Sequence, residues 1–229
     1  MTNHIVGPSE RATSTKQLLN KLRLDIILGH IPPETRIVEA QLSADMGVSR
    51  GPTRMALQIL EQEGLVKSLA NGGTVIVGFS MKNAEDMFDF RLMMEQRALQ
   101  LILDNPYVSY QPMLTVVDRI IQLNDKTQID ELTPTISNLD IQFHRSIMMM
   151  AGNQSMAQAW NTMSNVLYTV LIIANTSYTS FFDFLVKHKE VSDLILQRNK
   201  LCLDEIETHI LLAKKLTVER LSQKWNASS

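Results

Sequence analysis

Glycine and proline are distributed very unevenly along the chain, and this constrains the fold more than any other feature. Of the nine glycines only Gly152 lies beyond position 78, and four of the seven prolines also fall in that first stretch. Because both residues interrupt helices and form turns, the first part should be compact and rich in turns, and the remainder almost entirely helical. The sequence therefore predicts two domains, 1–79 and 80–229, that join near Ser80 to Asn83.

Length and composition are typical of a folded, soluble protein: 229 residues, 45% of them hydrophobic and 20% charged. The single cysteine, Cys202, cannot form an internal disulfide and fits a reducing cytoplasm. The first ten residues lack the basic-then-apolar order of a secretory signal. The longest apolar run, 166–174, is shorter than the roughly 20 residues of a membrane helix. We expect a cytoplasmic protein with no membrane association.

Helical periodicity and turn signals alternate through the first 79 residues. Ser49 is a good N-cap, and Pro52 fits the first turn of the helix that would follow it. Asn71-Gly72 between two apolar runs is a strong signal for a β-hairpin. The expected elements are helices over 14–28, 39–46 and 49–64, and strands over 65–69 and 74–77. A helix, a helix–turn–helix and a hairpin in this order predict a winged helix-turn-helix.

The stretch GVSRGPTRMAL places Arg50 and Arg54 one turn apart at the start of the third expected helix. The unpaired backbone N–H groups and the dipole at a helix N-terminus favour an anion, and the two arginines add to this positive end. An arginine there can form paired hydrogen bonds to a phosphate or to guanine. Residues 1–79 carry eight Lys and Arg against seven Asp and Glu, a net charge of only +1, and the rest carries −3. We therefore predict binding to double-stranded operator DNA by two copies acting together.

The run PPETRIVEAQLSADMGVSRGPTRMALQILEQEGLV resembles the DNA-binding domain of GntR-type bacterial transcription regulators. Their pattern is Leu-Gly-Val-Ser-Arg-x-Pro-Val-Arg-Glu-Ala-Leu, followed by Leu-x-x-x-Gly-Leu-Val, and the match covers nearly all of residues 13–79. The chain departs from it at Gly51, Thr53 and Met55, and Gly72 stands where the wing often has arginine. The DNA contacts that the resemblance implies are made by Arg36, Ser49, Arg50, Thr53, Arg54 and Gly73.

From Asn83 onward the pattern is helical with short interruptions. Turns are indicated at Asn105-Pro106, Thr133-Pro134, Gly152-Asn153 and Asn199-Lys200. They separate about six expected helices, over 83–103, 110–124, 134–151, 153–175, 181–199 and 201–223, and such helices pack as a bundle. The fold class expected for the whole chain is therefore mainly α, with an N-terminal winged helix-turn-helix followed by an all-α bundle.

Four residues of the second part have side chains suited to binding a metal ion. Asp140 and His144, in LDIQFHRS, are four positions apart and share one face of a helix, while His188 and His209 lie on later helices. Three imidazoles and one carboxylate suit Zn, Ni, Mn or Fe and leave room for water or an oxyanion. Taken singly, each histidine is an ordinary helix residue, and His188, between two lysines, would then be exposed. Spacing alone does not bring the three helices together.

The order and spacing of these four residues resemble the helical effector domain of the FadR-like subgroup of the same regulators, called FCD. FRLMMEQRAL resembles the first helix of that domain, DIQFHRSIMMMAGN resembles its Asp and His segment, and the similarity spans about residues 81–222. The usual Gly-Asp turn between the last two helices reads Arg-Asn-Lys here. The resemblance implies a homodimer in which Asp140, His144, His188 and His209 bind one divalent metal ion, with zinc as the first choice.

A metal ion with open coordination positions can hold a small carboxylate, and an arginine can bind the other end of that ligand. The resemblance places Arg91 and Asn153 beside such an effector, although an ion pair with Glu95, one turn away, explains Arg91 equally well. We expect a ligand-responsive transcription regulator, a repressor that senses a small organic acid, and not an enzyme. Two alternatives stay open: a metal-dependent hydrolase that uses the same four residues, and a regulator whose metal is purely structural.

Overall fold

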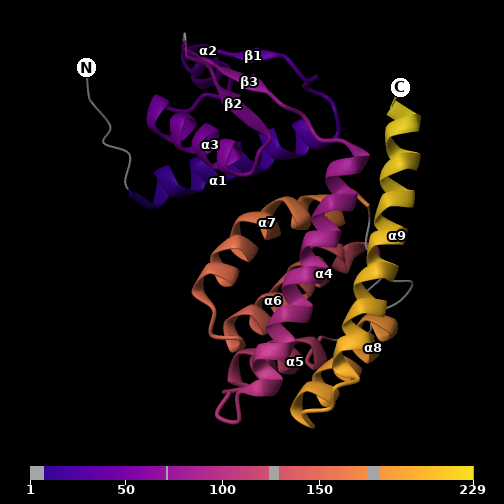
Figure 1. Cartoon of the computed structure of the whole chain (residues 1–229). Coiled ribbons are helices and arrows are strands. Elements are labelled where there is room, and N and C mark those ends of the chain that lie inside the picture. The colour runs from indigo at the N-terminus through magenta and orange to yellow at the C-terminus, as the bar shows by residue number, and fades with distance from the viewer. Residues whose placement is uncertain (1–7, 71, 124–128, 175–180, 229) are drawn as a thin grey trace. The chain divides into compact units, whose positions relative to one another are not determined.

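The computed structural model describes residues 8–70, 72–123, 129–174 and 181–228, and the chain divides into two compact units, Met1–Ser80 and Met81–Ser229 (Figure 1). Buried apolar side chains form a core within each unit. In the described ranges, no helix has both the length and the apolar character that crossing a membrane requires.

Within the described residues, the first unit has three helices and a three-stranded antiparallel sheet (Figure 1). Its elements are α1 (Pro8–Ile27), β1 (Arg36–Ile37), α2 (Glu39–Asp45), α3 (Arg50–Gln62), β2 (Val66–Ser68) and β3 (Thr74–Ile76). β3 is the central strand and pairs with both β1 and β2. This is the winged helix-turn-helix that the sequence predicted.

The three helices of the first unit enclose a small core, because α1 and α3 each bury one apolar face. The apolar α1 side chains that are at most 9% exposed are Leu18, Leu19, Leu22, Ile26 and Ile27. They follow the three- and four-residue spacing of one helix face and meet α3, where Leu60 is fully buried. A buried ion pair joins the same helices, since Arg23 Nε and Nη2 donate to the two carboxylate oxygens of Glu63 at 2.8 and 2.7 Å. The end of α3 is therefore fixed to α1.

The sheet includes one strand that the sequence did not predict. β1 is only two residues long, and Arg36 lies opposite Val75 of β3. Two residues are too few to show the alternation by which a strand is recognised. The expected hairpin is present between β2 and β3, and at its turn Gly72 and Gly73 have φ values of +83° and +88°, which glycine adopts without strain. Asn71, which contributed to the hairpin prediction, lies outside the described residues.

The described part of the second unit contains six helices, the number expected (Figure 1). They are α4 (Met81–Asp104), α5 (Gln111–Ile121), α6 (Ile129–Met150), α7 (Gln154–Ile173), α8 (Phe181–Leu196) and α9 (Cys202–Ser228). The turn predicted at Thr133-Pro134 is wrong, because Pro134 lies inside α6. Proline keeps a helical φ and removes one backbone hydrogen bond, and a helix of 22 residues accommodates this near its start.

The helices of the second unit surround one apolar core. Its largest fully buried side chains include Phe88, Phe143, Trp160 and Phe184, which come from four different helices. α4 lies alongside α9 (Figure 1), and α6 contacts α4, α5 and α7. This packing brings polar side chains from α4, α6, α8 and α9 to the same place inside the unit.

Candidate functional site

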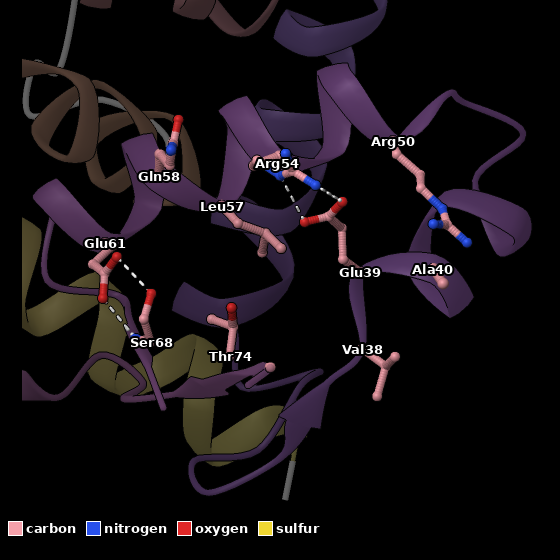
Figure 2. A pocket seen from close by; sticks show the side chains of 11 residues that line it. Val38, Glu39, Ala40, Arg50, Arg54, Leu57, Gln58, Glu61, Ser68 and Thr74 are labelled. Carbon is pink, nitrogen blue, oxygen red and sulfur yellow. Dashed lines mark hydrogen bonds and ion pairs between the residues drawn. The ribbon is translucent and has the colours of Figure 1, made fainter. Parts of the chain in front are cut away.

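The start of α3 is exposed, as a contact with nucleic acid would require. Ser49 takes the N-cap position with an extended backbone, but its side chain makes no capping hydrogen bond. Ser49 and Arg50 are both exposed, and Arg50 extends away from Arg54 in Figure 2. The N-terminus of α3, which is the positive end of its helix dipole, is therefore accessible to an anion. The predicted DNA contacts of these residues stay predictions.

A surface groove of about 560 Å³ runs beside this helix end, between α2, α3 and the hairpin (Figure 2). Arg50, Arg54, Glu39 and Glu61 are among its lining residues. Arg54 Nε and Nη2 donate to the two carboxylate oxygens of Glu39 at 3.1 and 3.0 Å. Glu61 accepts hydrogen bonds from the backbone N–H and the hydroxyl of Ser68 at 2.6 and 2.7 Å. Glu39 thus orients Arg54, and Glu61 connects α3 to Ser68 of the hairpin.

The expected DNA contact of Thr53 is not supported, because this residue is fully buried. Its hydroxyl donates to the backbone oxygen of Ser49 at 3.2 Å and accepts from the hydroxyl of Ser43 at 2.9 Å. Ser43 belongs to α2 and Thr53 to α3. Thr53 therefore fixes the helix–turn–helix internally.

Arg36 and Gly73 together shape the tip of the wing. The exposed Arg36 donates from Nη2 to the backbone oxygen of Gly72 at 2.8 Å. A Cβ atom at Gly73 would lie 3.1 Å from Arg36 Nε, so this glycine allows the guanidinium to lie close to the turn. The structure thus gives both residues a role in holding the wing, and their contact with DNA remains a prediction.

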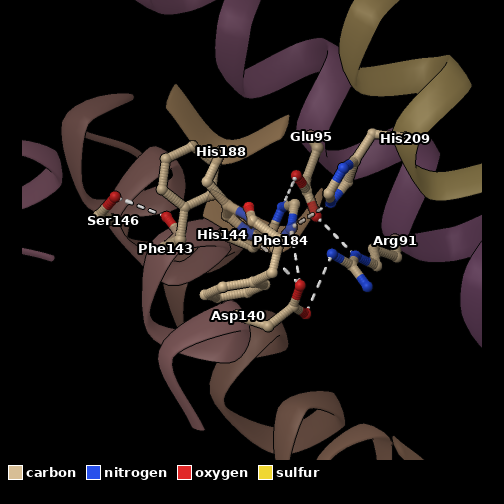
Figure 3. Close-up of polar contacts among 9 residues, drawn as sticks. All are labelled: Arg91, Glu95, Asp140, Phe143, His144, Ser146, Phe184, His188 and His209. Carbon is tan, nitrogen blue, oxygen red and sulfur yellow. Dashed lines mark hydrogen bonds and ion pairs between the residues drawn. The ribbon is translucent and has the colours of Figure 1, made fainter. Parts of the chain in front are cut away.

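Asp140, His144, His188 and His209 meet inside the second unit (Figure 3). Each offers one ligand atom, and the four atoms lie within 4.8 Å of one another. The first two residues come from α6, the third from α8 and the fourth from α9, and all are at most 6% exposed. His188 is only 1% exposed, so the interpretation of this residue as an exposed one between two lysines is wrong.

Three of the separations between these atoms are close to those between two ligands of one metal ion. His144 Nε2 lies 3.2 Å from His209 Nε2 and 3.7 Å from Asp140 Oδ1, and His188 Nε2 lies 3.4 Å from the same carboxylate oxygen. Two ligand atoms about 2.1 Å from a zinc ion, at angles of about 90° to 120°, are roughly 3.0 to 3.6 Å apart. Two imidazole nitrogens that face each other at 3.2 Å also require that at least one has no proton, as in a metal ligand.

Two of the histidines are oriented through their other ring nitrogen. His188 Nδ1 donates to the backbone oxygen of Phe184 at 2.7 Å, and His144 Nδ1 donates to Glu95 Oε2 at 2.6 Å (Figure 3). Such hydrogen bonds set the tautomer and direct Nε2 toward the ion in metal sites. Sequence reasoning missed this role of Glu95, because nothing in the spacing relates position 95 to position 144.

The protonation states inside the cluster also suit a cation. Burial opposes ionisation of Asp140, but the charges of His144 and Arg91 outweigh it and place the pKa of this carboxyl well below its usual value. Burial lowers the pKa of His188, and burial together with the neighbouring imidazoles lowers the pKa of His209 well below 6.5. An ionised carboxylate beside two neutral imidazoles is the state in which these groups coordinate metals.

Arg91 and Glu95 border the cluster on the α4 side. Arg91 Nε donates to Glu95 Oε1 at 2.9 Å, so the ion pair considered from the sequence is present. Arg91 Nη2 also lies 3.6 Å from Asp140 Oδ2, and both α4 side chains are at most 1% exposed. Burial and Arg91 oppose protonation of His144, but Glu95 and Asp140 outweigh them and raise its pKa. Arg91 thus lies beside the cluster, and its contact with an effector stays a prediction.

The expected effector contact of Asn153 is not supported by its position. Asn153 is exposed and occupies the N-cap of α7, where its side-chain oxygen accepts a hydrogen bond from the backbone N–H of Met156 at 3.1 Å. The Gly152-Asn153 pair is therefore explained by the turn between α6 and α7.

Comparison with protein families gives two matches that together cover most of the chain. Residues 14–76 match the bacterial regulatory proteins of the gntR family, and residues 86–211 match the FCD domain. The second match includes all four residues of the cluster and Arg91.

Individual relatives are similar over most of their length. The chain is 25% identical to the HTH-type transcriptional regulator YdhC of Bacillus subtilis, over 85% of each chain. It is 23% identical to the gluconate operon transcriptional repressor of the same organism, over 78% of this chain and 74% of that protein. Among solved structures, Lar, which controls the agr system of Listeria monocytogenes, is similar in fold, with a TM-score of 0.61 at 16% identity, over 92% of this chain and 94% of that one.

Proposed function

The chain belongs to the GntR family of bacterial regulatory proteins and carries an FCD domain, and we propose that it is a repressor whose operator binding responds to a small carboxylate held at a metal ion. Binding to DNA and regulation of transcription are properties of the family. The observation that carries the proposal is the buried cluster, in which four ligand atoms of the second unit lie within 4.8 Å of one another.

The donor set supports a divalent ion, and zinc is our first choice because one carboxylate and three imidazoles are ligands that it commonly takes. When bound, the ion supplies a positive charge that can hold one oxygen of an organic acid. Arg91 is the candidate for a second contact, since its guanidinium lies 3.6 Å from Asp140 Oδ2 and therefore at the edge of the cluster. The gluconate operon repressor among the relatives makes hydroxy acids a sensible class to screen.

The response to ligand would act through two copies of the chain. Two recognition helices must match two half-sites on the duplex, so a change in their spacing or orientation lowers affinity. The carboxylate must bind the DNA-binding and non-binding states unequally to cause that change. We propose that the protein is a homodimer, because a single winged helix with a net charge of +1 has modest affinity for a polyanion. We also propose that it acts in the cytoplasm, where the DNA is.

A second candidate role for the metal is purely structural. Four protein ligands are enough to complete a tetrahedral zinc shell, and the deep burial of all four favours this alternative. A hydrolase is less well supported, since Glu95, the carboxylate nearest the four ligands on α4, is already bonded to Arg91 and His144.

One set of measurements separates these possibilities. Elemental analysis of the purified protein should give one metal ion per chain, and titration with gluconate and other small organic acids should produce heat and weaken binding to operator DNA. Bound metal without any response to organic acids would favour the structural role. Protein with no bound metal, and no uptake of zinc on addition, would contradict the metal centre itself.

A further inference from the structure

Trp160 is the largest fully buried side chain among the described residues, and it is not one of the four candidate metal ligands. It lies on α7 and is 0% exposed. Its indole Nε1 atom is shielded from solvent and has no hydrogen-bond partner among the residues that the structure describes. An indole N–H can only donate, and a buried donor without an acceptor costs about 1 to 3 kcal/mol. A residue that carries this cost at a buried position calls for an explanation.

The indole ring lies close to the candidate metal site, with the guanidinium of Arg91 over its face. The Cζ atom of Arg91 is 5.8 Å from the centroid of the Trp160 ring, and the ring of His144 is 6.3 Å from it, centroid to centroid. The four candidate ligands come from α6, α8 and α9, and Arg91 comes from α4. α7 contacts α4, α6 and α9, and Trp160 is the α7 residue that lies near this cluster.

We propose that Trp160 is an effector-binding residue, whose indole N–H donates a hydrogen bond to the small anion bound beside the metal ion. This inference rests on the proposed function and adds a third contact to it. The ion and Arg91 supply positive charge, whereas the indole supplies a neutral donor. A carboxylate has about four acceptor positions on its two oxygens, so it can satisfy the ion, a guanidinium and an indole together.

The burial of Trp160 makes it suited to this task. The large ring is fully buried in the core, so little side-chain entropy is lost when its N–H meets a ligand. A ligand that supplies the missing acceptor removes an existing penalty, and the contact discriminates against molecules that lack an acceptor there. The same donor in an exposed side chain would gain less, because water would compete for it.

The test uses the indole N–H signals in a two-dimensional proton–nitrogen NMR spectrum of the zinc-loaded protein. The chain has two tryptophans, so the spectrum should contain two indole signals, and Trp225→Phe identifies that of Trp160. Sodium acetate is the probe, with sodium chloride at matched ionic strength as the reference, and the melting temperature is followed in the same titration. The proposal expects acetate to shift the Trp160 signal downfield and to slow its exchange with solvent. The Trp225 signal is the internal control and should stay in place.

The possible outcomes distinguish this inference from the proposed function. If acetate raises the melting temperature of the zinc-loaded protein but leaves the Trp160 signal unmoved, the anion binds without the indole and the inference is wrong. If acetate has no effect on either quantity, the carboxylate site itself is refuted, and the inference fails with it. A shift that chloride reproduces would also overturn the proposal.

A pair of variants extends the test to affinity. Trp160→Phe removes the N–H and keeps an aromatic ring. This variant should retain zinc, and its affinity for acetate should be lower by a factor of about ten or more, because a hydrogen bond to a charged group typically contributes at least a tenfold gain in affinity. Trp225→Phe, which removes the other indole, should bind acetate as the unmodified protein does. Equal acetate affinity in a folded, zinc-loaded Trp160→Phe protein would refute the role of the indole. If that variant fails to fold, the NMR measurement decides alone.

Discussion

Replacing Glu95 with glutamine should weaken both the helical unit and its metal site, for one physical reason. The Glu95 carboxylate accepts from Arg91 Nε at 2.9 Å and from His144 Nδ1 at 2.6 Å, and it is fully buried. Glutamine has one acceptor oxygen and one donor nitrogen, so it can satisfy only one of these two N–H groups and turns a donor toward the other. It also leaves the buried guanidinium of Arg91 with less negative charge nearby.

Breaking a buried pair in this way costs about 3 to 5 kcal/mol of the free energy of unfolding. Losing the hydrogen bond that orients a metal-binding histidine typically lowers metal affinity by about 10- to 100-fold. The first quantity is measured by urea unfolding of Glu95→Gln in the presence of a chelator, and the second by competition for zinc with a coloured chelator. Glu190→Gln is the matched control. Glu190 is 49% exposed and, among the described residues, forms an ion pair with Lys187, whose side chain is 42% exposed, so this change should alter stability by about 1 kcal/mol or less.

The result that would refute this reasoning is a Glu95→Gln protein with zinc affinity within about twofold of the original. It would show that the contact between Glu95 and His144 does not orient a ligand. A loss of stability no larger than that of Glu190→Gln would refute the energetic part separately.

Three further predictions concern the two candidate sites. Arg50→Ala should weaken operator binding by about 10- to 100-fold and leave the melting temperature nearly unchanged, because the side chain is exposed. The control Arg97→Ala, in the other unit, should change neither operator binding nor the melting temperature. A large loss of stability in Arg50→Ala would mean that Arg50 has a structural role. His144→Ala should abolish stoichiometric zinc binding, and a full complement of zinc in that variant would exclude His144 from the site. Zinc affinity should begin to fall while the pH is still above 6.5, because His144 has a raised pKa and its proton competes with the ion. Affinity that stays constant from pH 8 to pH 5 would argue against coordination by histidine.

The first unit was predictable from sequence to the extent that its signals are local. The start of α3 is marked by Ser49 and Pro52 within four residues, and the hairpin by a glycine turn between two apolar runs. β1 was not predictable, because it is a strand only through its pairing with β3, almost forty residues later. Thr53 illustrates a second limit, since a small polar residue one position from Pro52 gives no sign of whether it faces solvent or a serine of α2.

The cluster of one aspartate and three histidines was predictable in its residue types and not in its surroundings. The spacing of Asp140 and His144 places both on one helix face, but the positions of His188 and His209 required a family resemblance, because three separate helices have to meet. The two lysines beside His188 suggested that this histidine is exposed, which is wrong. Successive residues of a helix point about 100° apart, so a buried histidine can lie between lysines that reach solvent. The sequence suggested Glu95 only as a partner of Arg91; its contact with His144 and the burial of Trp160 near the cluster gave no signal, because both arise from tertiary contacts.

The paired hydrogen bonds between Arg54 and Glu39 place an internal competitor at the surface predicted to bind DNA. A phosphate group that takes over these N–H groups must displace a carboxylate, and because the two side chains are 66% and 29% exposed, solvent screens the pair and the displacement costs little. A small free anion makes few other contacts that could offset that cost. A DNA duplex that also contacts Arg50 and the N-terminus of α3 makes several. We therefore expect the ion pair to favour extended polyanions over free ions.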